Sequence, residues 1–285
     1  MNLIRKSQRF LLRRLCKAPD LHRAKRNLLS SDALSDQEKA LLDRVSLKIH
    51  GNDGMYVPFR ARHYLSVGLS AIRCIEDVLN RSKGDSAIRF ILDFPCGYGR
   101  ILRFLRARFP DADITGVELD RTALDFCTRA FSVRSLASEN DFTQLSLPDK
   151  FDLIWCGSLI THIDEQAATD LLKFFRDHLT PAGLCVFTTH GLTSVDRIQG
   201  TKKTYGLMAK ARQELLSQFR ENGYGYADYP DQNGYGISVV SHERMLALAE
   251  SAGNWHEVVF AERAWDGHQD VYGFVNAESR APVPA

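Results

Sequence analysis

The sequence predicts an α/β protein with a mostly parallel sheet covered by helices on both faces. From residue 89 onward, short apolar runs alternate with amphipathic segments long enough to be helices, which is typical of a parallel sheet with helical connections. The last two apolar runs, over 255–263 and 270–277, are joined by a turn too short for a crossover helix. They are therefore expected to pair antiparallel.

Each element follows from its own local pattern. Ser35 and Glu38 stand at capping-box spacing and predict the start of a helix. The region 192–236 interrupts the alternation with one helical stretch and a Gly/Tyr-rich loop. Periodicity predicts strands over 89–93, 113–118, 133–137, 151–156 and 183–189, and helices over 61–81, 98–109, 121–131, 164–179, 205–223 and 241–253.

These elements define the expected domain organisation. Residues 1–50 form a basic helical extension, and residues 51–285 form the main domain. Within the main domain we expect a core over 89–190, an insertion over 192–236, and a C-terminal helix with two strands over 241–277.

Composition describes an ordinary soluble protein, with 44% hydrophobic and 25% charged residues in a chain of 285. No apolar run approaches the roughly 18 to 20 residues of a membrane span. The six cysteines are scattered singly, without a C-x-x-C pair or metal-ligand spacing. This pattern predicts a reducing, cytoplasmic location and gives no reason to expect a disulfide framework or a metal site.

Charge is distributed unevenly along the chain. Residues 1–27 contain nine Lys or Arg and one acid, whereas the remaining residues contain 28 basic and 34 acidic side chains. The acidic body argues against nucleic acid as a partner. The basic segment is either a helix that contacts an anionic membrane surface or an acidic partner, or a helix packed on the domain, which we favour. Nothing in the sequence predicts an oligomeric state.

The stretch "LDFPCGYG", residues 92–99, predicts a nucleotide-type site. A strand ends in Asp93, Gly97 and Gly99 allow close backbone approach, and a helix start follows. The second strand ends in Glu118, whose carboxylate is placed to accept hydrogen bonds from the two hydroxyls of a ribose. Leu102 stands where the dinucleotide fingerprint has its third glycine, and Asp93 would repel a pyrophosphate. A cationic or zwitterionic ligand with an adenosine-like ribose is therefore expected.

At these motifs the sequence resembles the class I S-adenosylmethionine-dependent methyltransferases, over residues 89–190 by motif and to 277 by strand order. The family motif acid-x-Gly-x-Gly-x-Gly spans Asp93 to Gly99, with Pro95 in place of the first glycine. The resemblance implies a Rossmann-like seven-stranded sheet with an antiparallel last strand, and S-adenosyl-L-methionine as cofactor. It also implies a cofactor-binding set: Asp93, Pro95, Cys96, Gly97 and Gly99 for the methionine part, Glu118 and Leu119 for the ribose, Asp141 and Phe142 for the adenine, and Gly157 in the loop after the fourth strand.

Three histidines are predicted at the edge of the sheet where its strands end. His162 follows the fourth strand, His190 ends the fifth, and His268 precedes the last. Together with Asp270, they could deprotonate an acceptor hydroxyl as general base. We rank His162 and His268 above His190 as catalytic candidates. The alternative is that each is a hydrogen-bonded loop residue, and their spacing does not demand a metal.

The insertion 192–236 is the expected lid over the acceptor. Its tyrosines (Tyr224, Tyr226, Tyr229 and Tyr235) either present flat surfaces to a sugar or aromatic substrate or pack the lid on the domain. Tyr56 and Tyr64 are expected near the sulfonium as cation–π partners.

The acceptor can be narrowed by what the sequence lacks. The loop after the fourth strand reads Cys-Gly-Ser-Leu over 156–159, not the Asn/Asp-Pro-Pro-aromatic motif of enzymes that methylate exocyclic amines or glutamine. A small-molecule, sugar or lipid-linked acceptor is expected, with methylation at a hydroxyl. The alternatives are a catalytically silent cofactor-binding module, a protein methyltransferase recruited through the basic segment, and a dehydrogenase, which Leu102 disfavours.

Overall fold

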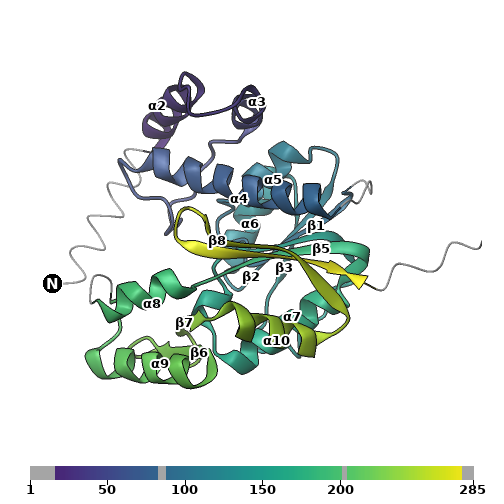
Figure 1. Ribbon diagram of the computed structural model, residues 1–285. Helices are drawn as coiled ribbons and strands as arrows, with labels where there is room; N and C mark the ends of the chain where they lie inside the picture. Colours follow the sequence, from purple (N-terminus) through teal and green to yellow (C-terminus); the bar gives the residue numbers. More distant parts are fainter. Residues whose placement is uncertain (1–16, 83–87, 201–203, 278–285) are drawn as a thin grey trace, which may run out of the picture. The chain divides into compact units, whose positions relative to one another are not determined.

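The structure, a computed structural model, describes residues 17–82, 88–200 and 204–277 (Figure 1). The chain divides into two compact units. The first unit comprises the described parts of Met1–Arg73 together with Pro95–Ser138, and the second comprises those of Cys74–Phe94 together with Glu139–Ala285. Residues 1–16, the larger part of the N-terminal basic segment, lie outside the described residues.

The strands form the predicted seven-stranded sheet, in the order β3-β2-β1-β4-β5-β9-β8. Within the second unit, β1 pairs parallel with β4 and β4 with β5, whereas β9 is antiparallel to both β5 and β8. The predicted α/β fold class is therefore confirmed. The strands are β1 (Phe90–Asp93), β2 (Asp113–Glu118), β3 (Arg134–Ala137), β4 (Phe151–Cys156), β5 (Leu179–Thr189), β8 (Trp255–Trp265) and β9 (Gln269–Asn276).

The first unit packs helices around β2 and β3. Its helix α3 starts as predicted, because Ser35 Oγ accepts from the Glu38 N–H while the Glu38 carboxylate accepts from the Ser35 N–H. Helix α4 continues from this unit into the second. The helices are α2 (Lys17–Leu29), α3 (Asp36–Arg44), α4 (Ala61–Arg81), α5 (Leu102–Arg108) and α6 (Arg121–Phe131).

Helix α5 begins later than its periodicity predicted. Gly97 and Gly99 both have positive φ, +50° and +74°, a conformation that cannot belong to a right-handed helix. The turn therefore extends to Ile101, and the helix starts at Leu102.

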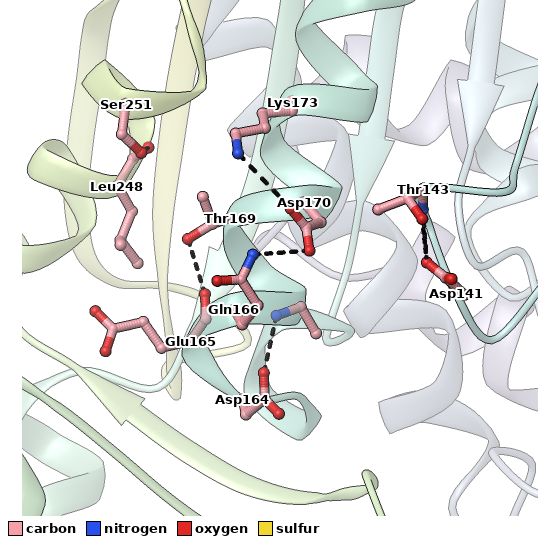
Figure 2. Close-up of polar contacts among 11 residues, drawn as sticks. Asp141, Thr143, Asp164, Glu165, Gln166, Thr169, Asp170, Lys173, Leu248 and Ser251 are labelled. Carbon is pink, nitrogen blue, oxygen red and sulfur yellow. Dashed lines mark hydrogen bonds and ion pairs between the residues drawn. The ribbon is translucent and has the colours of Figure 1, made fainter.

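In the second unit, α7 (Glu165–Asp177) packs against α10 (His242–Ala252) and against β5. Asp164 caps α7 by accepting from the Ala167 N–H at 2.8 Å, as Figure 2 shows. Arg244 of α10 forms an ion pair with Glu165 at the start of α7. A short 3₁₀ turn, η1 (Ile160–His162), precedes α7 and positions His162.

The insertion contains more regular structure than predicted. The helix α9 (Ala209–Asn222) was expected, but α8 (Leu192–Gln199) and the hairpin of β6 (Tyr224–Asp228) and β7 (Gly236–Val240) were not. These elements share a small hydrophobic core of their own, whose members include Ile198, Leu215, Ile237 and Val239. Residues that read as a Gly/Tyr-rich loop form a hairpin because their alternate apolar side chains enter this core.

Candidate active site

The glycine turn, Gly97 to Gly99, lies in the first unit. A side chain would be excluded at its two glycines for different physical reasons. A Cβ on Gly99 would lie 2.4 Å from Cε2 of Phe131, so this position is needed for packing. A Cβ on Gly97 would meet nothing within 4 Å. The backbone of Gly97 is thus held open at a point where a ligand can approach it closely.

Glu118, at the end of β2, is fixed beside this turn. Its Oε2 accepts from the Gly97 N–H at 2.9 Å, and its Oε1 accepts from the Leu119 N–H at 2.7 Å. Oε1 also accepts a longer hydrogen bond from the Asp120 N–H at 3.4 Å. Oε2 keeps a second lone pair, which suits a ribose hydroxyl donor. The Leu119 side chain is exposed. The first unit therefore offers an open glycine backbone and an oriented carboxylate, and both fit an adenosine-containing cofactor.

Cys96 contributes to the turn through packing. The cysteine is buried, and a Cβ on Gly116 of β2 would lie 3.0 Å from its Sγ. The side chain therefore lies against the neighbouring strand, and the backbone of Cys96 is fixed by its N–H, which donates to the Val117 carbonyl, and its carbonyl, which accepts from the Gly99 N–H. Pro95, just before it, is half-buried.

Arg103 stabilises the glycine turn by hydrogen bonds, and the sequence did not predict this role. The side chain is only 1% exposed. Its guanidinium donates to four backbone carbonyls, those of Gly99 (2.9 Å), Ser46 (3.1 Å), Lys48 (2.9 Å) and Tyr98 (3.4 Å). It also lies over the Tyr64 ring. The sequence does not reveal this role, because the acceptors of Arg103 are backbone oxygens, which every residue carries. No nearby acidic residue marks Arg103 as a buried arginine.

We expect Arg103→Met to lower the free energy of unfolding by about 3 kcal/mol, since it leaves buried carbonyls without a donor. Binding of S-adenosylhomocysteine should weaken as well, because the turn loses the bond to Gly99. Urea denaturation and calorimetry measure the two effects. Arg129→Met, on the exposed side of α6, is the matched control; equal effects of the two substitutions would contradict this role.

The second unit contains the other residues assigned to the cofactor. Asp93 ends β1 and is buried, and the ring of Phe94 packs edge-on against that of Phe142, with centroids 6.0 Å apart. Asp141 lies in an exposed turn, where its carboxylate accepts from the Thr143 N–H and hydroxyl (Figure 2). These two hydrogen bonds lower the pKa of Asp141. Gly157 follows β4, where a Cβ would lie 3.0 Å from each of two tryptophan rings, Trp155 and Trp265.

His162 occupies a defined position in the rim of the second unit. Its Nδ1–H donates to the carbonyl of Gly236 at 2.7 Å, which leaves the lone pair of the neutral ring on Nε2. Among the described residues, Nε2 has no hydrogen-bond partner. The ring stacks on that of Tyr235, 4.9 Å away and 43% exposed, and lies 5.9 Å from that of Tyr229. Burial lowers the pKa of His162.

His268 belongs to a separate group of rings in the same unit. Its Nδ1 lies 2.5 Å from an Arg197 nitrogen, so the imidazole accepts from the guanidinium. Its Nε2–H therefore donates to the Tyr205 hydroxyl at 3.4 Å, and that hydroxyl donates to Ser194 Oγ. The ring of His190, which is buried, lies 5.0 Å from that of His268. Both nitrogens of His268 thus have protein partners, whereas Nε2 of His162 has none among the described residues.

Asp270 is buried at the start of β9. Its Oδ1 accepts from the Arg263 N–H at 2.8 Å, and its Oδ2 lies so close to Gly191 that a Cβ there would come within 1.7 Å. Burial raises the pKa of Asp270. The carboxyl group therefore faces backbone at the point where β5, β9 and α8 meet.

Gln269 is a second residue that the sequence analysis did not single out. Its Oε1 accepts from Thr188 Oγ1 at 2.6 Å, and its Nε2 donates to Ser158 Oγ at 2.9 Å. The Ser158 N–H in turn donates to Thr188 Oγ1 at 2.8 Å. Ser158 has a left-handed φ of +68°, which this triangle of hydrogen bonds stabilises. The triangle joins the ends of β4, β5 and β9, and so fixes the loop that carries His162.

The expected position of Tyr56 and Tyr64 beside a sulfonium is wrong. Both tyrosines are buried; the Tyr56 hydroxyl donates to Asp20 and the Tyr64 hydroxyl to Asp53. The cation above the Tyr64 ring is the guanidinium of Arg103. Met55 and Val57, on either side of Tyr56, face outward instead.

Two of the four insertion tyrosines have packing roles. Tyr224 is buried and donates to the carbonyl of Ile163, and Tyr226 donates to Asp228 within its own hairpin. Only Tyr229 and Tyr235 gather around His162. Within the described ranges, no group of three or more His, Cys, Asp or Glu side chains could hold a metal ion, and no described helix is both long and apolar enough to cross a membrane.

Residues 91–183 match the family model described as a methyltransferase domain. The match begins in β1 and includes the glycine turn, Glu118 and the loop that carries His162. By this match, about a third of the chain is similar to a methyltransferase domain, in agreement with the resemblance drawn from the motifs. The match and the fold support a methyltransferase enzyme that uses S-adenosylmethionine as its cofactor.

Several solved structures are similar in fold. An S-adenosylmethionine-dependent methyltransferase from Clostridium acetobutylicum is 14% identical, with a TM-score of 0.50, over 72% of this chain and 89% of that one. DesVI from Streptomyces venezuelae is 15% identical, with a TM-score of 0.51, over 74% and 92%. The PH0226 protein from Pyrococcus horikoshii is 16% identical, with a TM-score of 0.50, over 72% and 89%. No curated protein sequence matches this chain.

Proposed function

We propose that the enzyme methylates a hydroxyl group of a small-molecule, sugar or lipid-linked acceptor. The observation that supports this proposal is the environment of His162. Its Nδ1–H is held by the Gly236 carbonyl, its Nε2 carries the lone pair, and its ring stacks on an exposed tyrosine, Tyr235. An imidazole fixed in this tautomer is suited to accept a proton from a hydroxyl positioned against the aromatic rings.

Bound S-adenosylmethionine supplies an electrophilic methyl group on a sulfonium, so the protein has to position the reactants and receive a proton. We propose that Glu118 and the open backbone of Gly97 orient the ribose and the methionine part. Phe142, whose ring packs on Phe94, and Asp141 would bind the adenine. The full proposed set is Asp93, Pro95, Cys96, Gly97, Gly99, Glu118, Leu119, Asp141, Phe142 and Gly157.

In this proposal His162 is the general base. Because burial lowers its pKa, the imidazole is neutral near pH 7 and ready to take up a proton as the methyl group arrives. His268 is a second candidate, but both of its nitrogens face protein partners, Arg197 and Tyr205, so we propose that its ring shapes the acceptor side. Asp270 would keep the turn that carries His268 in place.

The insertion supports the assignment of an acceptor side to the second unit. Its hairpin supplies both the Gly236 carbonyl and the Tyr235 ring to His162. We propose that residues 192–236 cover the acceptor. The methyltransferase domain in this proposal is residues 51–285, with a core of 89–190 and C-terminal elements over 241–277. Residues 1–50 are an extension of this domain.

The experiment that tests this function uses S-adenosylmethionine with a deuterated methyl group. The purified enzyme is incubated with fractionated cell extracts, and products are detected by mass spectrometry. We expect the deuterated methyl group in a small or lipid-linked molecule, as a methyl ether that is stable to mild base. Label in protein would favour a protein methyltransferase, whereas cofactor binding without labelled product would favour a silent binding module. The His162→Gln variant should form the same product at a much lower rate.

A further inference from the structure

The first unit exposes a short apolar loop whose alternate side chains point outward. Met55, Val57 and Phe59 are 60%, 42% and 73% exposed, whereas Tyr56 between them is fully buried. Scattered single apolar residues are normal on a protein surface, but three within five positions form a local patch. We call these three residues the apolar loop.

The apolar loop is held in place by helix α2 and by its own buried acid. Asp20 of α2 accepts from the Phe59 N–H at 3.0 Å and from the Tyr56 hydroxyl at 3.2 Å. Asp53 accepts from the Met55 N–H at 2.9 Å. Phe59 has a left-handed φ of +65°, which is unfavourable for an aromatic residue. The outward position of its ring is therefore maintained by specific hydrogen bonds.

Charges around the apolar loop are segregated by sign. Asp20 and Asp53 are the only acids in residues 20–30 and 51–64, and both are turned inward; the Asp20 side chain is 12% exposed. The exposed charged side chains of these segments are all arginines, Arg23, Arg26, Arg60 and Arg62. Of these, Arg23 pairs with Asp20 at 3.4 Å. Lys25 is half-buried beside Asp43 of α3, so it is not counted with them.

We propose that this surface binds an anionic lipid bilayer, with the apolar loop at the headgroup–acyl boundary and the arginines among the headgroups. Interfacial binding combines burial of apolar side chains with attraction between basic side chains and anionic lipids, and both parts lie together here. A nucleic acid or an acidic protein surface would satisfy the arginines but would leave Phe59 and Met55 without an apolar counterpart. This proposal is independent of the acceptor's identity.

Vesicle binding of the full chain tests the proposal. We expect sedimentation with phosphatidylcholine vesicles that contain about one-third phosphatidylserine, and much weaker binding to phosphatidylcholine alone. Met55→Ser combined with Phe59→Ser should weaken binding at least about tenfold. Met208→Ser is the matched control, because Met208 is 69% exposed in the second unit. Arg60→Glu combined with Arg62→Glu should weaken binding by a similar factor at low salt.

Depth measurements address the loop directly. Phe59→Trp should gain fluorescence quenching by brominated lipids, whereas Met208→Trp should not. The proposal is overturned if the wild-type chain does not bind anionic vesicles. It is also overturned if the double serine variant binds them as tightly as the wild type, while removal of residues 1–16 abolishes binding. It is also overturned if the serine variant loses only affinity for S-adenosylhomocysteine, because the loop would then belong to the cofactor site.

Discussion

Replacement of Gly97 by arginine is expected to weaken S-adenosylhomocysteine binding at least about a hundredfold, which corresponds to about 2.7 kcal/mol of binding free energy. The φ of +50° at Gly97 is unfavourable for any residue with a Cβ. The new side chain would also occupy the open space beside the backbone and disturb the N–H that donates to Glu118. Isothermal titration calorimetry measures the loss.

The matched control is Gly234→Arg. Gly234 has a φ of +73° and open space around it, but it lies in the turn between β6 and β7, so the backbone strain is similar and cofactor affinity should change at most a few-fold. Equal losses in the two variants would show that the effect is general destabilisation. Tight binding of NADH, with no binding of S-adenosylhomocysteine by the wild type, would contradict the assignment of the whole site.

Replacement of His162 by glutamine is expected to lower kcat by about 10²-fold, the usual contribution of a general base. Cofactor affinity should stay within a few-fold, because His162 is assigned to the acceptor. Since burial lowers the pKa of His162 below its ordinary value near 6.5, the wild-type rate should fall only as the pH drops through that lowered pKa. The pH–rate profile of the variant should lack this acid limb.

His268→Gln provides the comparison for this prediction. It should raise the KM for the acceptor while sparing kcat and the acid limb. If His162→Gln behaves in the same way, with kcat intact at saturating acceptor, then methyl transfer proceeds by positioning alone. The general-base role of His162 must then be abandoned.

The fold could be predicted well because its signals are local. Apolar runs in the strands, the capping box at Ser35 and the short connection before β9 each depend on neighbours in the sequence, and the structure confirms all three. The hairpin of β6 and β7 was missed because its glycines and tyrosines read as a loop. Its strands are stabilised by the core that they share with α8 and α9, and that core is a tertiary property.

The candidate site was predictable to the extent that backbone conformation dictates residue type. Gly97 and Gly99 have positive φ as a turn of this kind requires, and Glu118 stands at the end of its strand. Arg103, Gln269 and the buried tyrosine Tyr64 could not be placed in the same way. Their roles depend on partners that are distant in the sequence, such as the carbonyl of Ser46 or the hydroxyl of Thr188.

The backbone N–H donors that hold Glu118 have a consequence for turnover. Because Gly97 and Leu119 fix the carboxylate, little side-chain entropy is lost when a ribose binds. The ribose is the same in S-adenosylmethionine and in the spent cofactor. In its proposed role Glu118 therefore stabilises reactant, transition state and product complexes alike, which strengthens binding without accelerating the chemical step. In this role the carboxylate would also slow release of the spent cofactor, so turnover would depend on the ratio of methylated to demethylated cofactor.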